Sequence, residues 1–383
     1  MAAGLGQNID VAALYDELTD GLTKQVRIDE LLYAAAGRVP GLVPTRQEID
    51  AERKLKLADK SGIELAQGLL LAQLLALPRQ GSHLLEAMLA PTRPALEHLD
   101  EFITTGRVQL GPVTVTCEGK AGFLELSNPR HLNAEDGITL APTETAVDLI
   151  QLHPGIEVGV MRGGVIDHDQ RKYGGQRVFG AGINLTHLYY GKIDFLFYLL
   201  RDWGYVNKLF RGVLSPDGTV HEKLWVAVVE QFAIGGHCQV LHCMDYVIAT
   251  RGARLNLPAR KEGIIPGASN LRLPRFVGER AARQAILSGR EWRAGDPDAD
   301  ALVDDVVEPD DIEEAMRTRI SAMTDSGLVS AAGNRRMIRI GAEPPEVYRQ
   351  YMSAYAHEQA LCHLSPGLVA NLERHWNAPQ RSV

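Results

Sequence analysis

Residues 224–239 have the sequence Leu224-Trp-Val-Ala-Val-Val-Glu-Gln-Phe-Ala-Ile-Gly-Gly-His-Cys-Gln239, and no other segment constrains the architecture as strongly. The first six residues are apolar, and such a short apolar run is typical of a strand that is buried on both faces. Gly235 and Gly236 follow, and residues 240–244 are expected to form a helix. Glycines before a helix leave backbone N–H groups open to an anion. The segment therefore predicts a strand, a glycine turn and a helix that together can bind an anion.

Two kinds of anion fit such a turn: a phosphate, or the oxygen of a developing enolate. The segment contains neither GxxxxGK[ST] nor GxGxxG, so the nucleotide interpretation has no motif support. A second glycine turn, Gly180-Ala-Gly182, also follows strand-like sequence and can offer the amide of Ile183. Two backbone donors that converge on one oxygen form an oxyanion hole, which is worth about 3 kcal/mol per donor.

The sequence around these turns alternates between strands and helices. Val113–Cys117 and Gly122–Leu126 each alternate with period two and are separated by a Gly-Lys turn, which predicts a hairpin. Apolar runs at Ile156–Met161 and Tyr246–Thr250 predict buried strands. This alternation indicates an α/β fold with crossover connections.

A helical pattern precedes this central part. Residues 8–105 contain no strand pattern, and Asp10 is expected to cap a helix that begins at Val11. Residues 47–77 then show helical spacing until Pro78 stops it. No chemistry is evident here, so we interpret these helices as a scaffold or an oligomerisation arm.

A helical pattern also follows the central part. Beyond Pro309, helices are expected over 311–323 and 345–364. We therefore expect three parts: a helical N-terminal domain (1–106), an α/β catalytic core (107–310) and a C-terminal helical segment for oligomerisation or as a lid (311–383).

Composition and charge exclude several classes of protein. The 383 residues suit two domains or one large domain with appendages, and 40 Lys+Arg against 48 Asp+Glu, with no basic stripe, argue against nucleic acid and anionic membranes as partners. The apolar stretch 65–77 is shorter than the ~20 residues that span a bilayer. Residues 1–7 lack the features of a leader, and the four cysteines form no CxxC pair. We therefore expect a reduced, cytoplasmic protein.

Aromatic residues are concentrated in one segment. Eight of the 23 in the chain lie between Tyr189 and Phe210. They can belong to core helices, or they can wall a ligand pocket, since such pockets are mostly apolar with a few placed polar groups.

Six short motifs occur in an order that resembles the crotonase (enoyl-CoA hydratase/isomerase) superfamily. The resemblance covers about residues 110–310 and rests on Asn128–Ala134, Val178–Asn184, Ala233–Gln239, Ile264–Ala268 with Leu271–Arg275, Ala285–Gly289 and Leu302–Val307. It implies a spiral of ββα turns, assembly as a homotrimer or dimer of trimers, and a CoA thioester as substrate. It also implies that the thioester oxygen lies between the amides of Ile183 and Gly236, with Arg130 near the CoA phosphates.

The departures from the superfamily pattern define the expected chemistry. Where hydratases have two catalytic glutamates, this chain has Gln239 and Ala259. Hydration needs carboxylates to activate water and move a proton, and neither an amide nor a methyl group can do this. Hydratase activity is therefore not expected, although an enolate-stabilising site remains.

One branch of the superfamily fits this combination. The segments 177–190 and 232–239, with the helical extension, closely resemble the cofactor-independent dioxygenases that act on 3,5-dihydroxyphenylacetyl-CoA in vancomycin-type glycopeptide biosynthesis. The resemblance implies reaction with O2, without cofactor or metal, to give 3,5-dihydroxyphenylglyoxylate and CoA. The candidate residues are Arg201 and Glu135 for the ring hydroxyls, Gln239 for those hydroxyls or the reacting centre, and Ile183, Leu185 and Ile264 for a dry O2 pocket.

Simpler interpretations stay open. Arg201 and Glu135 can be ordinary surface or helix-end charges, and Leu185 and Ile264 can be ordinary core. The protein can also be another crotonase-type enzyme, such as a thioesterase, isomerase or decarboxylase, or a non-catalytic acyl-CoA binder. No His, Asp or Glu is placed by a motif as the general base for the benzylic proton.

The pairs His237-Cys238 and His242-Cys243 permit a metal site, because Cys238 and His242 lie one helical turn apart. The same is true of His357 with Cys362-His363. We expect these side chains to be buried packing instead, and we predict no metal.

Overall fold

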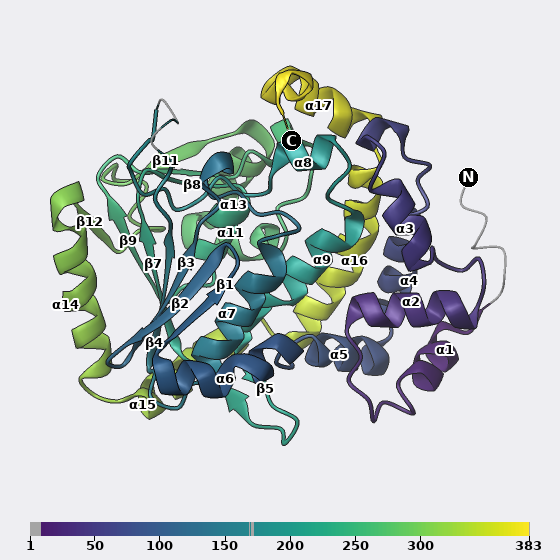
Figure 1. Cartoon of the computed structure of the whole chain (residues 1–383), viewed down its shortest axis with the longest axis horizontal. Coiled ribbons are helices and arrows are strands. Elements are labelled where there is room, and N and C mark those ends of the chain that lie inside the picture. The colour runs from purple at the N-terminus through teal and green to yellow at the C-terminus, as the bar shows by residue number, and fades with distance from the viewer. Residues whose placement is uncertain (1–8, 168, 170–171, 383) are drawn as a thin grey trace.

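The computed structural model describes residues 9–167, 169 and 172–382. Residues 1–8, which include the segment examined for a leader, lie outside the described part. Figure 1 shows a twisted sheet beside a large helical body. Within the described residues, seven strands form the main sheet in the order β1 (Arg107–Leu110), β2 (Val113–Glu118), β3 (Ala121–Leu126), β4 (Val158–Gly163), β7 (Leu224–Val229), β9 (Tyr246–Thr250) and β12 (Asp305–Val307).

The main sheet is antiparallel at one edge and parallel elsewhere. β1, β2 and β3 pair antiparallel, which confirms the expected hairpin, and β3, β4, β7, β9 and β12 pair parallel. Parallel strands are buried on both faces and therefore need cover on each side. Val226 and Val228 pack with α14 (Ile312–Thr324), whereas Trp225 and Ala227 belong to the opposite cluster with α7 (Leu140–Leu152).

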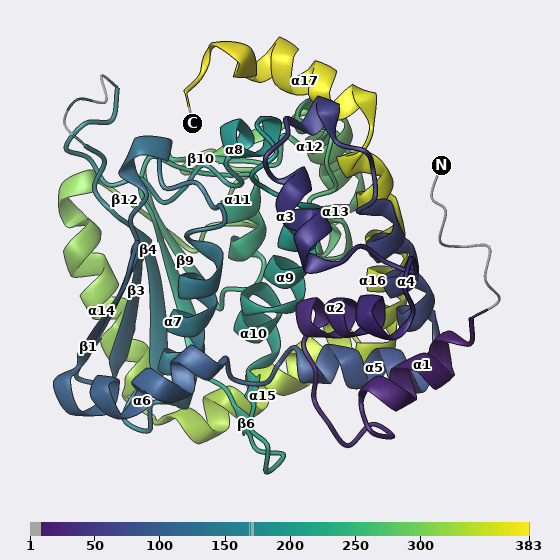
Figure 2. The ribbon, with the colours of Figure 1, turned by 45° about the vertical axis from the view of Figure 1, so that its right-hand side comes forward.

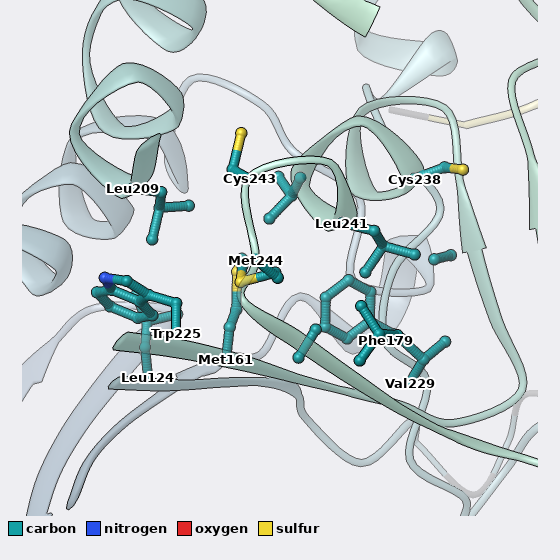
Figure 3. Packing of buried hydrophobic residues seen from close by; sticks show 14 of the residues in the cluster. Leu124, Met161, Phe179, Leu209, Trp225, Val229, Cys238, Leu241, Cys243 and Met244 are labelled. Carbon is teal, nitrogen blue, oxygen red and sulfur yellow. The ribbon is translucent and has the colours of Figure 1, made fainter. Parts of the chain in front are cut away.

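A smaller sheet carries the start of the helix that follows the glycine turn. It comprises β8 (Phe232–Ile234), β10 (Arg254–Asn256) and β11 (Glu291–Arg293), with β8 parallel and β11 antiparallel to β10. Helix α11 (Gly236–Leu241) begins directly after β8. Figure 3 shows Leu241, the last residue of this helix, and Met244, which follows the helix, packed close to Phe179 and Met161. This core holds α11, and with it the glycine turn, against the main sheet.

Most other elements belong to the helical body or to the connections around the sheets. Those before the sheet are α1 (Val11–Leu18), α2 (Ile28–Arg38), α3 (Arg46–Glu52), η1 (Leu57–Asp59), α4 (Leu65–Ala76), α5 (Pro78–Ala87) and α6 (Arg93–Thr105). Those within the α/β part are η2 (Pro129–His131), α8 (Leu185–Tyr189), α9 (Phe195–Trp203), α10 (Tyr205–Arg211), β5 (Val213–Leu214), β6 (Val220–His221), α12 (Ala259–Glu262) and α13 (Ser269–Ser288). The last are η3 (Pro309–Asp311), α15 (Leu328–Ala342), α16 (Pro345–His363), α17 (Pro366–Trp376) and η4 (Ala378–Gln380).

The N-terminal helices do not bury a core by themselves. Helices α4 and α16 lie side by side in the helical body (Figure 2). One apolar cluster joins them to α9 through side chains such as Leu71, Phe195 and Met352. Helices α4 and α16 approach so closely that a β-carbon at Gly68 would lie 2.4 Å from that of Ala360. Six of the eight aromatics of 189–210 belong to or pack against this apolar cluster, whereas Tyr205 and Phe210 pack in the core beside the main sheet, so the aromatic segment contributes to both cores.

Several helix boundaries differ from expectation. Residues 47–77 form α3, η1 and α4 in place of continuous helical spacing, and Pro78 begins α5 directly after α4. Proline is compatible with the first turn of a helix, since the N–H that it lacks has no partner there. The helix expected at 240–244 begins earlier, at Gly236, and ends at Leu241. In the C-terminal part, α15 and α17 were not anticipated.

Among the described residues, no helix combines the length and the apolar character that crossing a bilayer requires.

Candidate active site

The two glycine turns meet in the structure. A β-carbon at Gly182 would lie 2.8 Å from the amide nitrogen of Gly236 and 2.7 Å from the carbonyl oxygen of Ile234. Gly182 also has a φ of +77°, a backbone conformation that side chains with a β-carbon rarely adopt. Glycine is therefore required at residue 182 for two independent reasons, and its absence of a side chain brings the turns together.

The local hydrogen bonding leaves the backbone amides of Ile183 and Gly236 without an acceptor among the described residues. Glu135 pairs with this segment by donating to the Gly182 carbonyl (2.7 Å) and accepting from the Asn184 amide (2.8 Å), a pattern that does not use the Ile183 amide. Gly236 is the first residue of α11, where N–H groups have no partner within the helix. Within the described part of the chain, neither amide donates a hydrogen bond to another protein group. The geometry therefore provides two backbone donors at the contact between the turns.

His237 holds the first turn against the second. Its Nδ1 accepts a 3.0 Å hydrogen bond from the Gly182 amide, and its ring packs edge-on to Phe179 with 5.6 Å between the centroids. Burial lowers the pKa of His237 to about 4, so the ring is neutral near pH 7. Because Nδ1 is the acceptor, the proton of the neutral ring is on Nε2.

A buried ion network lies directly beneath the Gly236 turn. The Arg201 Nε donates to both carboxylate oxygens of Glu135, at 3.0 and 2.9 Å. Its other nitrogens donate to Gln239 Oε1 (2.9 Å), Asp202 Oδ1 (3.0 Å) and the Gly236 carbonyl (2.6 Å). The Tyr205 hydroxyl donates to Glu135 as well. The network thus connects the start of α11 to α9 and α10.

The charges of this network are mutually dependent. Burial would raise the pKa of the Glu135 carboxyl, but the Arg201 guanidinium and the hydrogen bond from Tyr205 outweigh this effect and hold that pKa below its usual value. Arg201 is only 2% exposed, so the pair has almost no water to screen it. Removing one member would leave the other charge buried without its partner.

A cavity of about 370 Å³ lies beside the two turns. Its apolar lining includes Ile183, Leu185 and Ile234. Basic groups also line it, among them Arg130, Arg254 and Lys261. A mostly apolar cavity with a few charged groups is typical of a small-molecule site, and the basic groups favour an anionic portion of the ligand.

The structure brings the candidate residues together in two groups. Ile183, Leu185 and Arg130 line the cavity, and Ile264 belongs to the same apolar cluster as Ile183. The second group consists of Arg201, Glu135, Gln239 and Gly236, which lie beneath the turn and are joined by hydrogen bonds. The individual roles of these residues stay predictions.

The concentrated aromatic residues are core in this structure. The aromatic side chains that line the cavity are Tyr173, Phe232 and Trp376, and none of them belongs to 189–210. They come from segments far apart in the sequence, so local composition carried no signal for them. The cavity lining also includes Glu262, which no motif indicated.

The His and Cys side chains of α11 and of the two residues after it take part in packing. His242 Nδ1 lies 3.0 Å from Ser269 Oγ, and Cys243 Sγ accepts from Arg272 at 2.9 Å. Burial raises the pKa of the Cys238 thiol to about 12, so this thiol is protonated. In the part of the chain that the structure describes, no three His, Cys, Asp or Glu side chains are grouped to hold a metal ion.

Comparisons with known proteins identify relatives of this chain. A family model described as enoyl-CoA hydratase/isomerase matches residues 173–374, further toward the C-terminus than the motifs indicated. A (3,5-dihydroxyphenyl)acetyl-CoA 1,2-dioxygenase of Amycolatopsis orientalis is 47% identical over 353 residues, which cover 91% of this chain and 80% of that protein. A probable enoyl-CoA hydratase of Rhizobium meliloti (strain 1021) is 28% identical over 204 residues, 53% of this chain and 71% of that protein.

Solved structures support the fold. An enoyl-CoA hydratase of Mycobacterium avium subsp. paratuberculosis K-10 superposes with a TM-score of 0.57 at 18% identity, covering 72% of this chain and 100% of that chain. An enoyl-CoA hydratase of Bacillus halodurans gives a TM-score of 0.56 at 16% identity, covering 69% of this chain and 99% of that chain. At these identities the likeness establishes the architecture of the α/β part and not its reaction.

Proposed function

The chain belongs to the enoyl-CoA hydratase/isomerase family, and we propose that it is a cofactor- and metal-independent dioxygenase that converts 3,5-dihydroxyphenylacetyl-CoA and O2 to 3,5-dihydroxyphenylglyoxylate and CoA. The observation that carries this proposal is the 47% identity, over 91% of the chain, to a dioxygenase for that thioester. The site supports it independently, since the two free amides persist where Gln239 and Ala259 replace the glutamates of hydratases.

Substrate binding follows from the lining of the cavity. Arg130, Arg254 and Lys261 are suited to the phosphates of CoA, because guanidinium and ammonium groups are strong donors to phosphate oxygens. The thioester oxygen then lies at the amides of Ile183 and Gly236. These donors stabilise the negative charge that appears on that oxygen when a benzylic proton leaves, and they do so without rearranging.

The oxygen chemistry can be written with balanced atoms and electrons. The enolate transfers one electron to O2, and the two radicals combine to a peroxide at the benzylic carbon. The terminal peroxide oxygen attacks the thioester carbonyl and expels the CoA thiolate. Cleavage of the O–O bond with loss of the second benzylic proton gives the keto acid. Both oxygen atoms enter the product, one benzylic proton ends on the CoA thiol, and the other is released.

O2 is proposed to occupy an apolar site formed by Ile183, Leu185 and Ile264. Ile183 and Ile264 are 8% and 7% exposed, and Leu185 packs against the same cluster. A dry apolar site suits an apolar gas and excludes water from the enolate.

Arg201, Glu135 and Gln239 are proposed to recognise the ring hydroxyls or to hold the groups that do. Their hydrogen bonds to one another include the Gly236 carbonyl, so ring recognition and the oxyanion donor belong to one assembly. Any shift of this assembly on substrate binding would move the Gly236 amide as well.

O2 consumption tests the proposed function. The purified protein is treated exhaustively with chelator and given 3,5-dihydroxyphenylacetyl-CoA, and O2 uptake and CoA release are followed together. The proposal expects one O2 consumed per CoA released. CoA release without O2 uptake would identify a thioesterase on this scaffold, and silence in both measurements would contradict the substrate assignment.

We propose a homotrimer or dimer of trimers as the assembly and the cytoplasm as the location. Val329, Met337 and Ile338 on α15 are 92%, 62% and 71% exposed in the single chain, which supports burial against another copy. The four cysteines are free, as expected where thiols stay reduced. Sedimentation of the wild type and of Ile338→Glu tests the assembly: the variant is expected to dissociate, and a monomeric wild type would contradict the proposal.

A further inference from the structure

Glu262 places a carboxylate beside the two free amides. A β-carbon on Gly235 would lie 3.4 Å from Glu262 Oε1 and 3.9 Å from Oε2, and it would lie 3.7 Å from the Gly182 Cα. Gly235 and Gly182 immediately precede the residues whose amides form the hole. Glu262 also lines the cavity proposed for the substrate. Its carboxylate is therefore close both to the site of the thioester oxygen and to the space that the acyl group would occupy.

Several buried carboxylates among the described residues are paired with cations. Glu135 pairs with Arg201 at 2.9 Å, and Glu343 pairs with Arg272 at 2.9 Å. The half-buried Glu262 side chain has no ion pair with a cation and no hydrogen bond to another side chain among the described residues. A carboxylate without a charged partner in a mostly apolar cavity is typical of a functional group.

Burial raises the pKa of Glu262 to about 7. A base with a pKa near the working pH combines a useful fraction of the ionised form with a strong tendency to accept a proton. Protonation also removes the energetic penalty of a buried charge, so the site itself favours proton uptake.

The position in sequence fits this role. Ala259 and Glu262 begin and end α12, and residues three apart lie on the same face of a helix. Ala259 stands where hydratases carry a glutamate. The Glu262 carboxylate thus lies one helical turn from the position at which hydratases carry a glutamate. It reaches the two free amides from the same helix.

We propose that Glu262 is the general base that removes the benzylic proton from the bound thioester. This role rests on the proposed function. The benzylic C–H bond breaks, its electron pair moves into the thioester carbonyl to form the enolate, and the proton bonds to the Glu262 carboxylate. The same proton passes to the departing CoA thiolate, which leaves as the thiol and restores the carboxylate.

Other charged or titratable groups share the cavity with Glu262. They are Arg130, His131, Tyr173, Arg254, Lys261, His375 and Arg381. Tyr198 on α9 is close enough for Glu262 to contribute to its pKa, which burial chiefly raises. His131 is the rival base among them, although burial and His187 lower its pKa. His131→Asn therefore separates the two candidates.

The decisive measurement is hydrogen exchange at the benzylic carbon without O2. Wild-type protein in D2O is expected to exchange the benzylic hydrogens of 3,5-dihydroxyphenylacetyl-CoA, followed by mass spectrometry. Glu262→Gln is isosteric and uncharged, so it preserves the fold, and exchange is expected to fall about 100-fold or more. Glu262→Asp, which keeps a carboxylate, is expected to exchange faster than Glu262→Gln. Binding of the thioester is expected to change only a few-fold.

The outcomes distinguish this inference from the proposed function. Wild-type O2 uptake with exchange unchanged in Glu262→Gln would overturn the role of Glu262 and leave the dioxygenase intact. Loss of exchange in His131→Asn with Glu262→Gln unaffected would assign the base to His131. A wild type that consumes no O2 with this thioester would overturn the proposed function and the role of Glu262 with it.

Discussion

The imidazole of His237 accepts a 3.0 Å hydrogen bond from the amide of Gly182, and this bond joins the two turns whose free amides are the proposed oxyanion donors. The two residues are far apart in sequence but come from turns that must meet if the amides of Ile183 and Gly236 are to point at one atom. The ring is supported in turn by Gly180, where a β-carbon would lie 2.4 Å from it. A structural histidine therefore sets the geometry of a backbone site, and its chemistry does not require it to titrate.

Replacing His237 with Phe tests this relationship. An aromatic ring is kept, although phenyl is larger than imidazole, and the buried Gly182 N–H loses its acceptor, at a cost of about 1–3 kcal/mol in the free energy of unfolding. We expect kcat with the arylacetyl-CoA to fall more than KM rises, since the oxyanion donor matters most in the transition state. Denaturant unfolding and steady-state O2 uptake measure both effects. Wild-type kcat in a stable His237→Phe protein would contradict the positioning role.

Gly182→Ala is expected to abolish activity. The new methyl group would lie 2.8 Å from the Gly236 nitrogen and must push the turns apart. Gly218→Ala is the matched control, because Gly218 also has a positive φ, +83°, but has open space around the position of its β-carbon. Backbone strain affects both variants, whereas only Gly182→Ala disturbs the hole. Equal activities of the two variants would show that contact between the turns is not needed.

Breaking the Arg201–Glu135 pair is expected to be severe. Arg201→Met leaves the Glu135 carboxylate buried without its guanidinium, and such changes cost about 3–5 kcal/mol. The matched control is Arg283→Met, whose partner Glu279 and whose own side chain are 71% and 70% exposed, so that its effect stays within about 1 kcal/mol. Urea unfolding measures both variants. Similar losses in the two would contradict the burial argument.

The same pair predicts a dependence of stability on acid pH. The pKa of Glu135 is held below its unfolded value, so its contribution to stability is present above the unfolded pKa and is lost as pH falls through the folded pKa. Glu135→Gln removes this contribution. We therefore expect the difference in unfolding temperature between wild type and Glu135→Gln to shrink as the solution is acidified below the usual range of a glutamate.

Glu262 predicts the opposite dependence near neutrality. Burial raises the pKa of Glu262 from 4.5 to about 7, so the folded state holds this proton more tightly and stability falls as pH rises through that interval. Glu262→Gln is expected to remove this fall, and thermal unfolding between these pH values measures it. Identical pH profiles of stability in the two proteins would contradict the burial of this carboxylate.

Activity is expected to have the reverse pH dependence, because the base works in its ionised form. Wild-type kcat/KM for O2 uptake should therefore rise with pH through an apparent pKa of about 7. The residual kcat/KM of Glu262→Gln should not rise with pH in this range. The same rise of kcat/KM with pH in the variant would mean that a group other than Glu262 causes it.

Local patterns were sufficient for much of the fold. The hairpin of β2 and β3, the strand β9 and the cap of α1 by Asp10 follow from short-range periodicity and side-chain chemistry. The prediction was wrong at Pro78, where α5 follows α4 without a loop. Helical spacing of apolar residues continues across such a boundary, so it does not show where one helix ends and the next begins. The division of the chain near residues 106 and 310 stays a prediction, since one apolar cluster joins the N-terminal helices to α9 and α16.

The order of residues alone identified the two glycine turns, because they depend on the backbone freedom of single residues. The loss of both hydratase glutamates and the kind of reaction were inferred from the resemblance of the motifs to a known family. The order of residues could not place Glu262 beside the amides, or Arg201 beneath Gly236 with Glu135 and Gln239, since these contacts join residues from separate segments. The packing of α9, α11 and α12 around the two sheets determines which of these residues are in contact. That packing depends on the burial of apolar surface across the whole chain, and no short segment carries it.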